Sequence, residues 1–353
     1  MGIFKYVLYL LGIILAIPLF VLLTLLIKLP ITISGVGYLL GALLVVSGLI
    51  LAPRMSRYYL LVIAGGIVVA LVVSVRIFLL GQNTGSGLKV IALPQGKTSS
   101  PVNALIDEQD SLIFGEALFH QIGGDSDNEH DGLTSAFLTA YSEMRKEGNF
   151  SSSIVSTYLG LQGPNHFDAV IIKPEELPQF GVVFLHGYMG NVTAQCWEIA
   201  QAVKKLGGVT VCPSTGWTGE WWQPDGQAIL RATFDYIMGQ GIQRFYLGGF
   251  SNGGFGISRL ALQWKDEKGL AGLFFIDGFT NGTSIREVGL PVLILEGAQD
   301  ERVPVTAARQ FALDVGDLGT YVELEGDHFL IMKRPDLVQN EIVKWLEQQE
   351  TGK

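Results

Sequence analysis

The chain has 353 residues, a formal net charge of −9, and 48% hydrophobic against only 16% charged residues. This length exceeds that of one ordinary domain, and the low charged fraction indicates lipid-facing sequence. The basic residues form no run that could follow a phosphate backbone, so we expect no nucleic-acid partner.

Three apolar segments occupy residues 1–80 and predict a membrane region. Residues 3–27, 31–52 and 58–80 are each long enough to cross a hydrocarbon core of about 30 Å as a helix. A cleavable signal peptide is the alternative for the first segment. Its apolar stretch exceeds the usual length, however, and no small-residue cleavage site follows it. We therefore expect three retained spans.

Lysine and arginine residues in the short loops indicate the orientation of these spans. One side would hold Lys5, Arg54 and Arg57, and the other Lys28 and the group Arg76, Lys89 and Lys97. Early charges weigh most, which favours a cytoplasmic amino terminus. After three crossings the remainder of the chain would then lie on the extracytoplasmic side.

Two connecting segments follow the membrane region. Residues 81–101 are rich in Gly, Ser, Thr and Gln, which predicts a flexible linker. In residues 102–150, apolar positions recur at three- and four-residue intervals, which predicts a helical lead-in. His120 and His130 lie near acidic residues there, but their spacing fits no metal-ligand pattern, so we expect a solvated loop.

Residues 151–353 alternate short β-rich runs with helices, which predicts a largely parallel sheet with helices on both faces. We expect a hairpin of residues 154–161 and 167–173 first. Further strands are expected at 181–185, 209–212, 244–250, 271–276, 291–296 and 320–324. The intervening helices are expected at 193–206, 225–238, 254–264, 306–315 and 335–348.

Residues 249–253 have the sequence Gly-Phe-Ser-Asn-Gly, which fits a nucleophile elbow. In that motif a serine occupies a strained turn between a strand and a helix. The preceding run 244–250 supplies the strand, and three glycines near the serine leave room for the close approach of strand and helix. Ser251 is therefore the candidate nucleophile.

A serine hydroxyl needs a base within hydrogen-bond reach and a third group that orients this base. His328 follows the last predicted strand, and Asp300 follows the strand before it, so the three residues occur in the order Ser, acid, His. Asp277 is the runner-up for the acid. Glu301 and Asp327 are further rivals because each is adjacent to one member of the set.

Two further parts of a hydrolytic site have candidates. The backbone N–H of Asn252 and one from the segment after residue 185, from Tyr188 or alternatively Met189, would bind a developing oxyanion. His186 is then structural. The candidates for a substrate pocket are Met189 and three tryptophans of the loop after residue 212, with packing of that loop as their alternative role: Trp217, Trp221 and Trp222.

Through these residues the chain resembles the α/β-hydrolase family over roughly residues 153–349. The resemblance implies an eight-stranded sheet with a catalytic triad and little or no helical cap, because few residues separate Asp277 from Pro291. It also implies ester or amide chemistry, since the nucleophile is a serine. We expect a membrane-anchored serine esterase or lipase that acts on a small ester or lipid-like substrate without metal or organic cofactor. A peptidase, an acyltransferase and a catalytically silent binding module are the alternatives.

The two cysteines, Cys196 and Cys212, fall on segments that are neighbours in this fold. If the domain faces an oxidising compartment, they could form a disulfide. With only two cysteines present, we favour two buried free thiols and keep the disulfide as the alternative.

Overall fold

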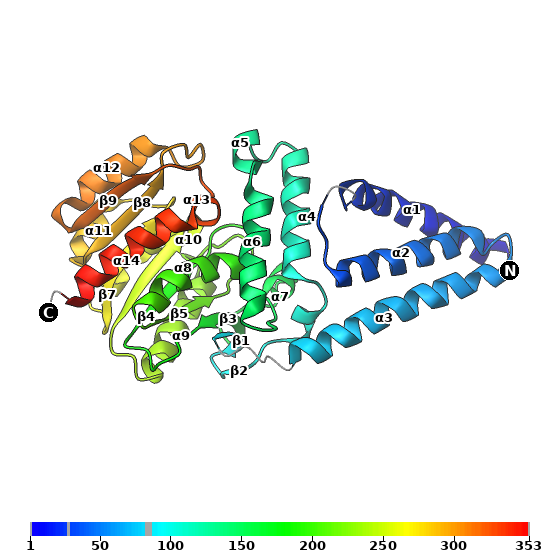
Figure 1. Ribbon diagram of the computed structural model, residues 1–353, viewed down its shortest axis with the longest axis horizontal. Coiled ribbons are helices and arrows are strands. Elements are labelled where there is room, and N and C mark those ends of the chain that lie inside the picture. Colours follow the sequence, from blue (N-terminus) through cyan, green and yellow to red (C-terminus); the bar gives the residue numbers. More distant parts are fainter. Residues whose placement is uncertain (1, 27–28, 82–86, 352–353) are drawn as a thin grey trace. The chain divides into compact units, whose positions relative to one another are not determined.

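The computed structural model describes residues 2–26, 29–81 and 87–351, and its chain divides into two compact units (Figure 1). One unit comprises Met1–Gln82 with Ala104–Ser126, and the other comprises Asn83–Asn103 with Asp127–Lys353. The lead-in expected as one segment, residues 102–150, is thus divided between the units.

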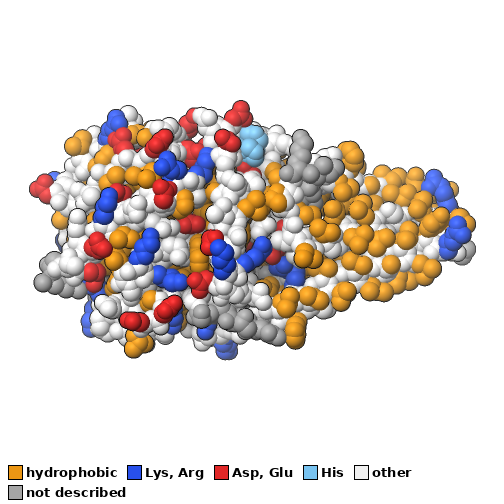
Figure 2. Space-filling view, in the orientation of Figure 1, with side chains coloured by type: hydrophobic (Ala, Val, Ile, Leu, Met, Phe, Trp, Pro, Cys, Tyr) orange, Lys and Arg blue, Asp and Glu red, His pale blue; other side chains and the backbone are white. Residues whose placement is uncertain are grey.

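Three long helices of the first unit agree with the three expected spans. They are α1 (Gly2–Leu26), α2 (Ile33–Leu51) and α3 (Tyr59–Gly81), and each is long and apolar enough to cross a membrane. The short 3₁₀ turn η1 (Ser56–Tyr58) lies between α2 and α3. Hydrophobic side chains cover much of the visible surface of these helices (Figure 2), as contact with lipid would require. Lys28, which contributes to the expected orientation, lies outside the described residues.

Glycines allow α2 and α3 to approach closely. A Cβ atom added to Gly41 would lie 2.6 Å from Cγ2 of Val69, and one added to Gly65 would lie 2.6 Å from the carbonyl oxygen of Gly41. One added to Gly37 would lie 2.6 Å from Cγ2 of Val72. Small residues therefore line this helix contact, as in small-xxx-small packing.

The first unit also contains α4 (Glu108–Gln121), which polar contacts join to the three apolar helices. The Asp110 carboxylate accepts hydrogen bonds from the backbone N–H of Thr32 at 2.8 Å and from its hydroxyl at 2.6 Å. The Arg76 guanidinium donates to the Ala104 carbonyl at 2.7 Å and to Asp107 at 3.1 Å. Both contacts lie at helix termini, and they fix the start of α4 against the ends of α2 and α3.

The second unit is built on a nine-stranded sheet with the order β2-β1-β3-β5-β4-β6-β7-β8-β9. Strand β3 is antiparallel to both β1 and β5, whereas the pairs from β5 to β9 are parallel. The strands are β1 (Leu88–Leu93), β2 (Lys97–Thr98), β3 (Phe167–Ile172), β4 (Phe180–Leu185), β5 (Gly208–Pro213), β6 (Phe245–Phe250), β7 (Leu270–Ile276), β8 (Val292–Gly297) and β9 (Gly319–Leu324).

Helices lie on both faces of the sheet, as the alternating pattern predicts (Figure 1). One group packs around α8; it comprises α6 (Leu133–Lys146), α8 (Thr193–Lys205), α13 (Leu330–Lys333) and α14 (Pro335–Thr351). A second group carries residues of one buried hydrophobic cluster; it comprises α9 (Pro224–Gly239), α10 (Asn252–Leu260), α11 (Gly282–Val288) and α12 (Val305–Val315). The predicted α/β-hydrolase fold is confirmed. Its nine strands include β1 and β2, which are not among the eight expected, whereas residues 154–161 contribute no strand.

One edge of the sheet comes from the segment that composition predicts to be a flexible linker. Within residues 81–101, β1 pairs with β3 along its whole length, and Leu88 and Val90 are buried. The prediction fails because a six-residue strand contributes little to the composition of a segment that is otherwise rich in Gly, Ser, Thr and Gln. Residues 82–86 of the same segment lie outside the described residues.

The expected hairpin of residues 154–161 and 167–173 is wrong in its first strand, because residues 154–158 form the helix α7 (Ile154–Tyr158). Local hydrogen bonds explain the difference. The Ser153 carbonyl accepts the Thr157 N–H and the Ser156 hydroxyl, both at 2.9 Å. The Ser156 hydroxyl also lies 2.7 Å from the buried Asp168 carboxylate. A helical turn satisfies these polar groups, whereas the apolar pair at its start indicates a strand equally well.

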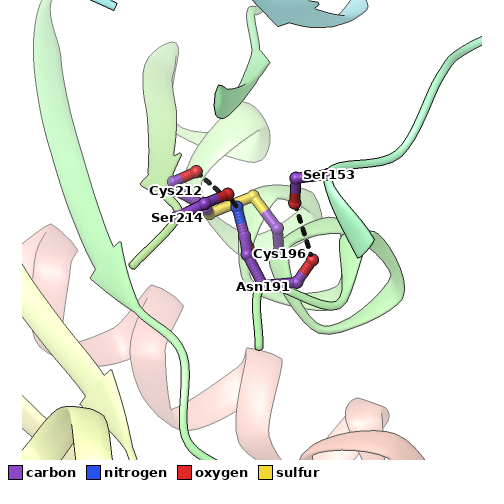
Figure 3. Close-up of a disulfide and its surroundings, with 5 residues drawn as sticks. All are labelled: Ser153, Asn191, Cys196, Cys212 and Ser214. Atoms are coloured by element: carbon purple, nitrogen blue, oxygen red, sulfur yellow. Dashed lines mark hydrogen bonds between the residues drawn. A yellow bond between two sulfur atoms is a disulfide. The ribbon is translucent and has the colours of Figure 1, made fainter. Parts of the chain in front are cut away.

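The two cysteines form a disulfide, so the expectation of two free thiols is wrong (Figure 3). Cys196 lies on α8 and Cys212 on β5, with their Cα atoms 6.1 Å apart. The Asn191 side-chain amide donates to the Cys212 carbonyl at 2.8 Å and to the Ser214 hydroxyl at 3.0 Å. The packing of α8 against β5 thus brings the two cysteines together. The number of cysteines alone does not predict that they are paired.

Candidate active site

Ser251 occupies the turn between β6 and α10 with the backbone strain expected of a nucleophile elbow. Its φ and ψ are +49° and −118°, and a non-glycine residue rarely adopts such a conformation. A Cβ atom added to Gly253 would lie 2.1 Å from the Leu185 carbonyl oxygen, and one added to Gly249 would lie 2.4 Å from the Gly253 carbonyl carbon. Side chains do not fit at these two positions. The glycines therefore permit the tight turn that raises Ser251 above the sheet edge.

The loops after β8 and β9 bring Asp300 and His328 to this serine. His328 Nε2 lies 3.1 Å from Ser251 Oγ, and His328 Nδ1 lies 2.7 Å from Asp300 Oδ2. Asp300 Oδ1 accepts the backbone N–H groups of Arg302 at 2.7 Å and Val303 at 2.8 Å. An ionised Asp300 makes Nδ1 the donor, which leaves Nε2 free to accept the serine proton. The three residues expected together form one hydrogen-bonded chain.

The rival acids have other partners. Asp327 accepts the Phe329 N–H at 2.8 Å and the Lys333 ammonium at 2.6 Å. Glu301 is exposed to solvent. Asp277 is fully buried at the end of β7, where its Oδ1 accepts the Gly297 N–H at 2.8 Å. Among the described residues, Asp300 is the carboxylate that is hydrogen-bonded to His328.

The segment after β4 lies directly against the nucleophile. A Cβ atom added to Gly187 would lie 3.0 Å from Cβ of Ser251, and Met189 has a φ of +78°. This is the segment from which Tyr188 or Met189 is expected to donate an N–H to an oxyanion. Asn252 is the first residue of α10, so its N–H has no partner within the helix. Both expected donor segments thus meet at Ser251.

His186 supports this segment as a neutral side chain. Burial lowers the pKa of His186 from 6.5 to about 4. Its Nε2 accepts the Thr215 N–H at 3.2 Å, so Nδ1 carries the proton and donates to the Gly187 carbonyl at 2.7 Å. These bonds agree with the structural role expected from its position in the sequence.

The three tryptophans of the loop after β5 have different environments. Trp221 is fully buried and its indole N–H donates to the His186 carbonyl at 2.9 Å, so its expected place in a substrate pocket is wrong. Local sequence does not distinguish a buried from an exposed tryptophan in a loop. Trp222 lies under the Arg259 guanidinium, 4.0 Å from the ring centre. Trp217 is 46% exposed and packs edge-on against the Tyr188 ring, whose centroid is 4.9 Å away.

A cavity of about 360 Å³ lies beside the elbow, and the sequence does not reveal it. Its apolar lining includes Phe255, Phe279, Val303 and Phe311. The Phe255 N–H donates to the Ser251 carbonyl at 3.0 Å, and the Val303 N–H holds Asp300. The cavity wall is therefore joined through the backbone to two of the three residues of the hydrogen-bonded chain. Since its lining comes from segments far apart in sequence, no local pattern signals it.

One lead-in helix of the second unit contacts the loop that holds Asp300. The helix α5 (Asp127–His130) carries Glu129, whose buried carboxylate accepts two hydrogen bonds from the Arg302 guanidinium, at 2.6 and 2.9 Å. The Lys333 ammonium donates to the Asn128 carbonyl at 2.7 Å. Thus α5 is the element that covers the Asp300 loop from outside the predicted hydrolase region.

Between β7 and β8, α11 is only seven residues long, which agrees with the expected absence of a large cap.

No protein-family model matches the sequence, and no curated protein is detectably similar to it. Among solved structures, Est1E from Butyrivibrio proteoclasticus is similar in fold with 16% identity and a TM-score of 0.45, covering 52% of this chain and 94% of that chain. An alpha-beta serine hydrolase homologue from Coxiella burnetii has 20% identity and a TM-score of 0.44, with the same two coverages of 52% and 94%. The esterase domain of a Rhodothermus marinus protein has 14% identity and a TM-score of 0.42, covering 53% and 93%.

Proposed function

We propose that the chain is a membrane-anchored serine hydrolase that cleaves a carboxylic ester through an acyl-enzyme, with Ser251, His328 and Asp300 as its catalytic triad. The observation that supports this most strongly is the hydrogen-bonded chain from Asp300 through His328 to Ser251. It supplies a nucleophile, a base and an orienting carboxylate, which are the three groups that acyl transfer by serine requires.

Each group has one role in the reaction. His328 Nε2 takes the hydroxyl proton as Ser251 Oγ attacks the ester carbonyl carbon. The N–H groups of Asn252 and of Tyr188 or Met189 stabilise the developing oxyanion. The imidazolium then donates its proton to the departing alcohol. Water attacks the acyl-enzyme in the second half-reaction, again with His328 as the base, and the acid product leaves.

The cavity beside the elbow would hold the apolar part of the substrate. Its volume of about 360 Å³ is near the lower end of the range for ligand pockets, about 300–1,000 Å³. Aromatic and aliphatic side chains form much of its lining, so a short or medium acyl chain or an aryl group fits its chemistry better than a charged group. The exposed pair of Tyr188 and Trp217 adds a second apolar surface near the serine.

Labelling of the full chain in detergent micelles by a fluorophosphonate tests the triad. We expect wild-type protein to be labelled and to hydrolyse p-nitrophenyl esters, and Ser251→Ala to lose both properties while its melting temperature is retained. Hydrolysis by Ser251→Ala at a rate near that of the wild type would remove Ser251 from the site.

The second unit, here called the catalytic unit because it carries the proposed triad, would face the extracytoplasmic side of the membrane. Lys5, Arg54 and Arg57 are the basic residues at the amino-terminal side of the spans, and such residues favour the cytoplasm. The disulfide between Cys196 and Cys212 favours an oxidising compartment for the sheet. Protease added to sealed cells should therefore digest the catalytic unit. Digestion that occurs only after lysis would place this unit in the cytoplasm.

A further inference from the structure

Asp277 is a buried carboxyl group beside the proposed triad that the mechanism above does not use. It is fully buried, and its φ of +48° is rare for a non-glycine residue. Its Oδ1 accepts the Gly297 N–H, whereas its Oδ2 has no hydrogen-bond partner among the described residues. Buried polar atoms are normally paired, so this oxygen needs an explanation.

The surroundings of Asp277 favour its protonated form. The ionisable groups that act on it are Glu296 and Asp300 from the β8 end and Asp327 from the loop after β9, and all three are carboxyl groups. Burial, together with these neighbours, raises the pKa of Asp277 well above its ordinary value. A protonated carboxyl group has an O–H donor, and apolar burial is known to keep a catalytic-site carboxyl neutral for this use.

Asp300 offers an acceptor position for that donor. A carboxylate has about four lone-pair positions. Asp300 uses three of them, for the N–H groups of Arg302 and Val303 and for His328. A carboxylate oxygen of Asp277, one of Asp300 and a ring nitrogen of His328 all lie within 4.8 Å of one another. The remaining position of Asp300 is on Oδ2, the oxygen that holds the imidazole.

We propose that Asp277 is a positioning residue, whose neutral carboxyl group donates a hydrogen bond to Asp300 and thereby fixes the carboxylate that orients His328. This inference rests on the proposed function. Neutrality is essential to the role. A second negative charge at this distance would stabilise the imidazolium over the neutral base that the mechanism needs, and would move the acidic inflection of kcat/KM to higher pH.

The pH dependence of kcat/KM for p-nitrophenyl acetate tests this role with the full chain in detergent. Asparagine at position 277 keeps a side-chain donor and, like the neutral Asp277, carries no charge. We therefore expect Asp277→Asn to retain most of the activity, with an acidic inflection within about half a pH unit of the wild type. Asp277→Leu lacks the donor, and we expect kcat to fall about tenfold or more with KM nearly unchanged. Glu198→Gln is the matched control, because Glu198 is a buried carboxyl on α8 that is not among the groups acting on Asp277, and its profile should equal that of the wild type.

Two results would overturn the inference. Asp277→Leu with the full kcat of Asp277→Asn would show that no donor is needed. An acidic inflection of Asp277→Asn that falls by a unit or more would show that Asp277 is ionised in the wild type. If Asp277→Leu does not fold, Asp277→Ala removes the donor without added volume and replaces it. Ser251→Ala measured beside these variants separates the outcomes: residual activity there refutes the proposed function, whereas its loss leaves the Asp277 result as a test of this residue alone.

Discussion

Replacement of Asp300 by asparagine should disable the proposed base, and the structure indicates why. Asp300 Oδ1 accepts two backbone N–H groups, from Arg302 at 2.7 Å and Val303 at 2.8 Å. In Asp300→Asn these two donors hold the amide oxygen, so the amide NH₂ faces His328 Nδ1. That nitrogen must then accept, which places the imidazole proton on Nε2, where it blocks transfer from Ser251.

A wrong tautomer of this kind lowers kcat by about 10⁴-fold, which corresponds to about 5 kcal/mol in the barrier. Steady-state hydrolysis of p-nitrophenyl acetate by the full chain measures the effect. Asp327→Asn is the matched control, since Asp327 adjoins His328 but accepts from Phe329 and Lys333. We expect its kcat within about threefold of the wild type. The reasoning fails if Asp300→Asn retains a tenth of the activity or more, and a large loss in Asp277→Asn would then identify Asp277 as the acid.

Three further predictions concern the cavity, the lead-in contact and a buried carboxyl group. Ala307→Phe should fill part of the cavity, so kcat/KM should fall about tenfold for p-nitrophenyl esters of longer acyl chains but not for the acetate. Leu313→Phe, at an exposed position of the same helix, should change kcat/KM for neither kind of ester. Arg302→Ala removes two hydrogen bonds to the buried carboxylate of Glu129, which should lower the free energy of unfolding by about 2 kcal/mol. Differential scanning calorimetry should then record a melting temperature lower by several degrees. An unchanged melting temperature would contradict this. Burial raises the pKa of Glu198 from 4.5 to about 7, so its contribution to stability is complete below pH 4.5 and is lost as the pH rises through 7. Glu198→Gln should therefore melt higher than the wild type at pH 8.5 and not at pH 4.5, and an equal difference at both values would refute the assignment.

The candidate site could be predicted from the sequence because its residues follow successive strand ends. Parallel strands place their carboxyl ends at one edge of a sheet, so Ser251, Asp300 and His328 had to converge once the strand order was known. Their hydrogen bonds agree with that expectation, and their catalytic roles remain a prediction. The sequence separates Asp300 from Asp277 less clearly, because both follow a strand and only side-chain geometry distinguishes them.

Other features depend on contacts that no local pattern encodes. The sequence predicts Trp221 near a substrate, but its indole is buried beneath the segment after β4, where its N–H donates a hydrogen bond to the His186 carbonyl. The disulfide required the pairing of α8 with β5 to be known in detail. The cavity combines α10, α12 and the loops after β7 and β8, and is therefore a property of the packed fold alone.

The interleaving of the two units bears on how the spans and the sheet depend on each other. Residues 104–126 belong with the three apolar helices, while the flanking pieces Asn83–Asn103 and Asp127–Lys353 belong with the sheet. Strand β1, from the first flanking piece, pairs with the whole of β3. A second unit that began at residue 151, where the sequence alone predicts the hydrolase domain to start, would lack β1 and expose the β3 edge with its unpaired backbone groups. Because the sheet needs a strand encoded before α4, the second unit is complete only when the chain on both sides of α4 is present.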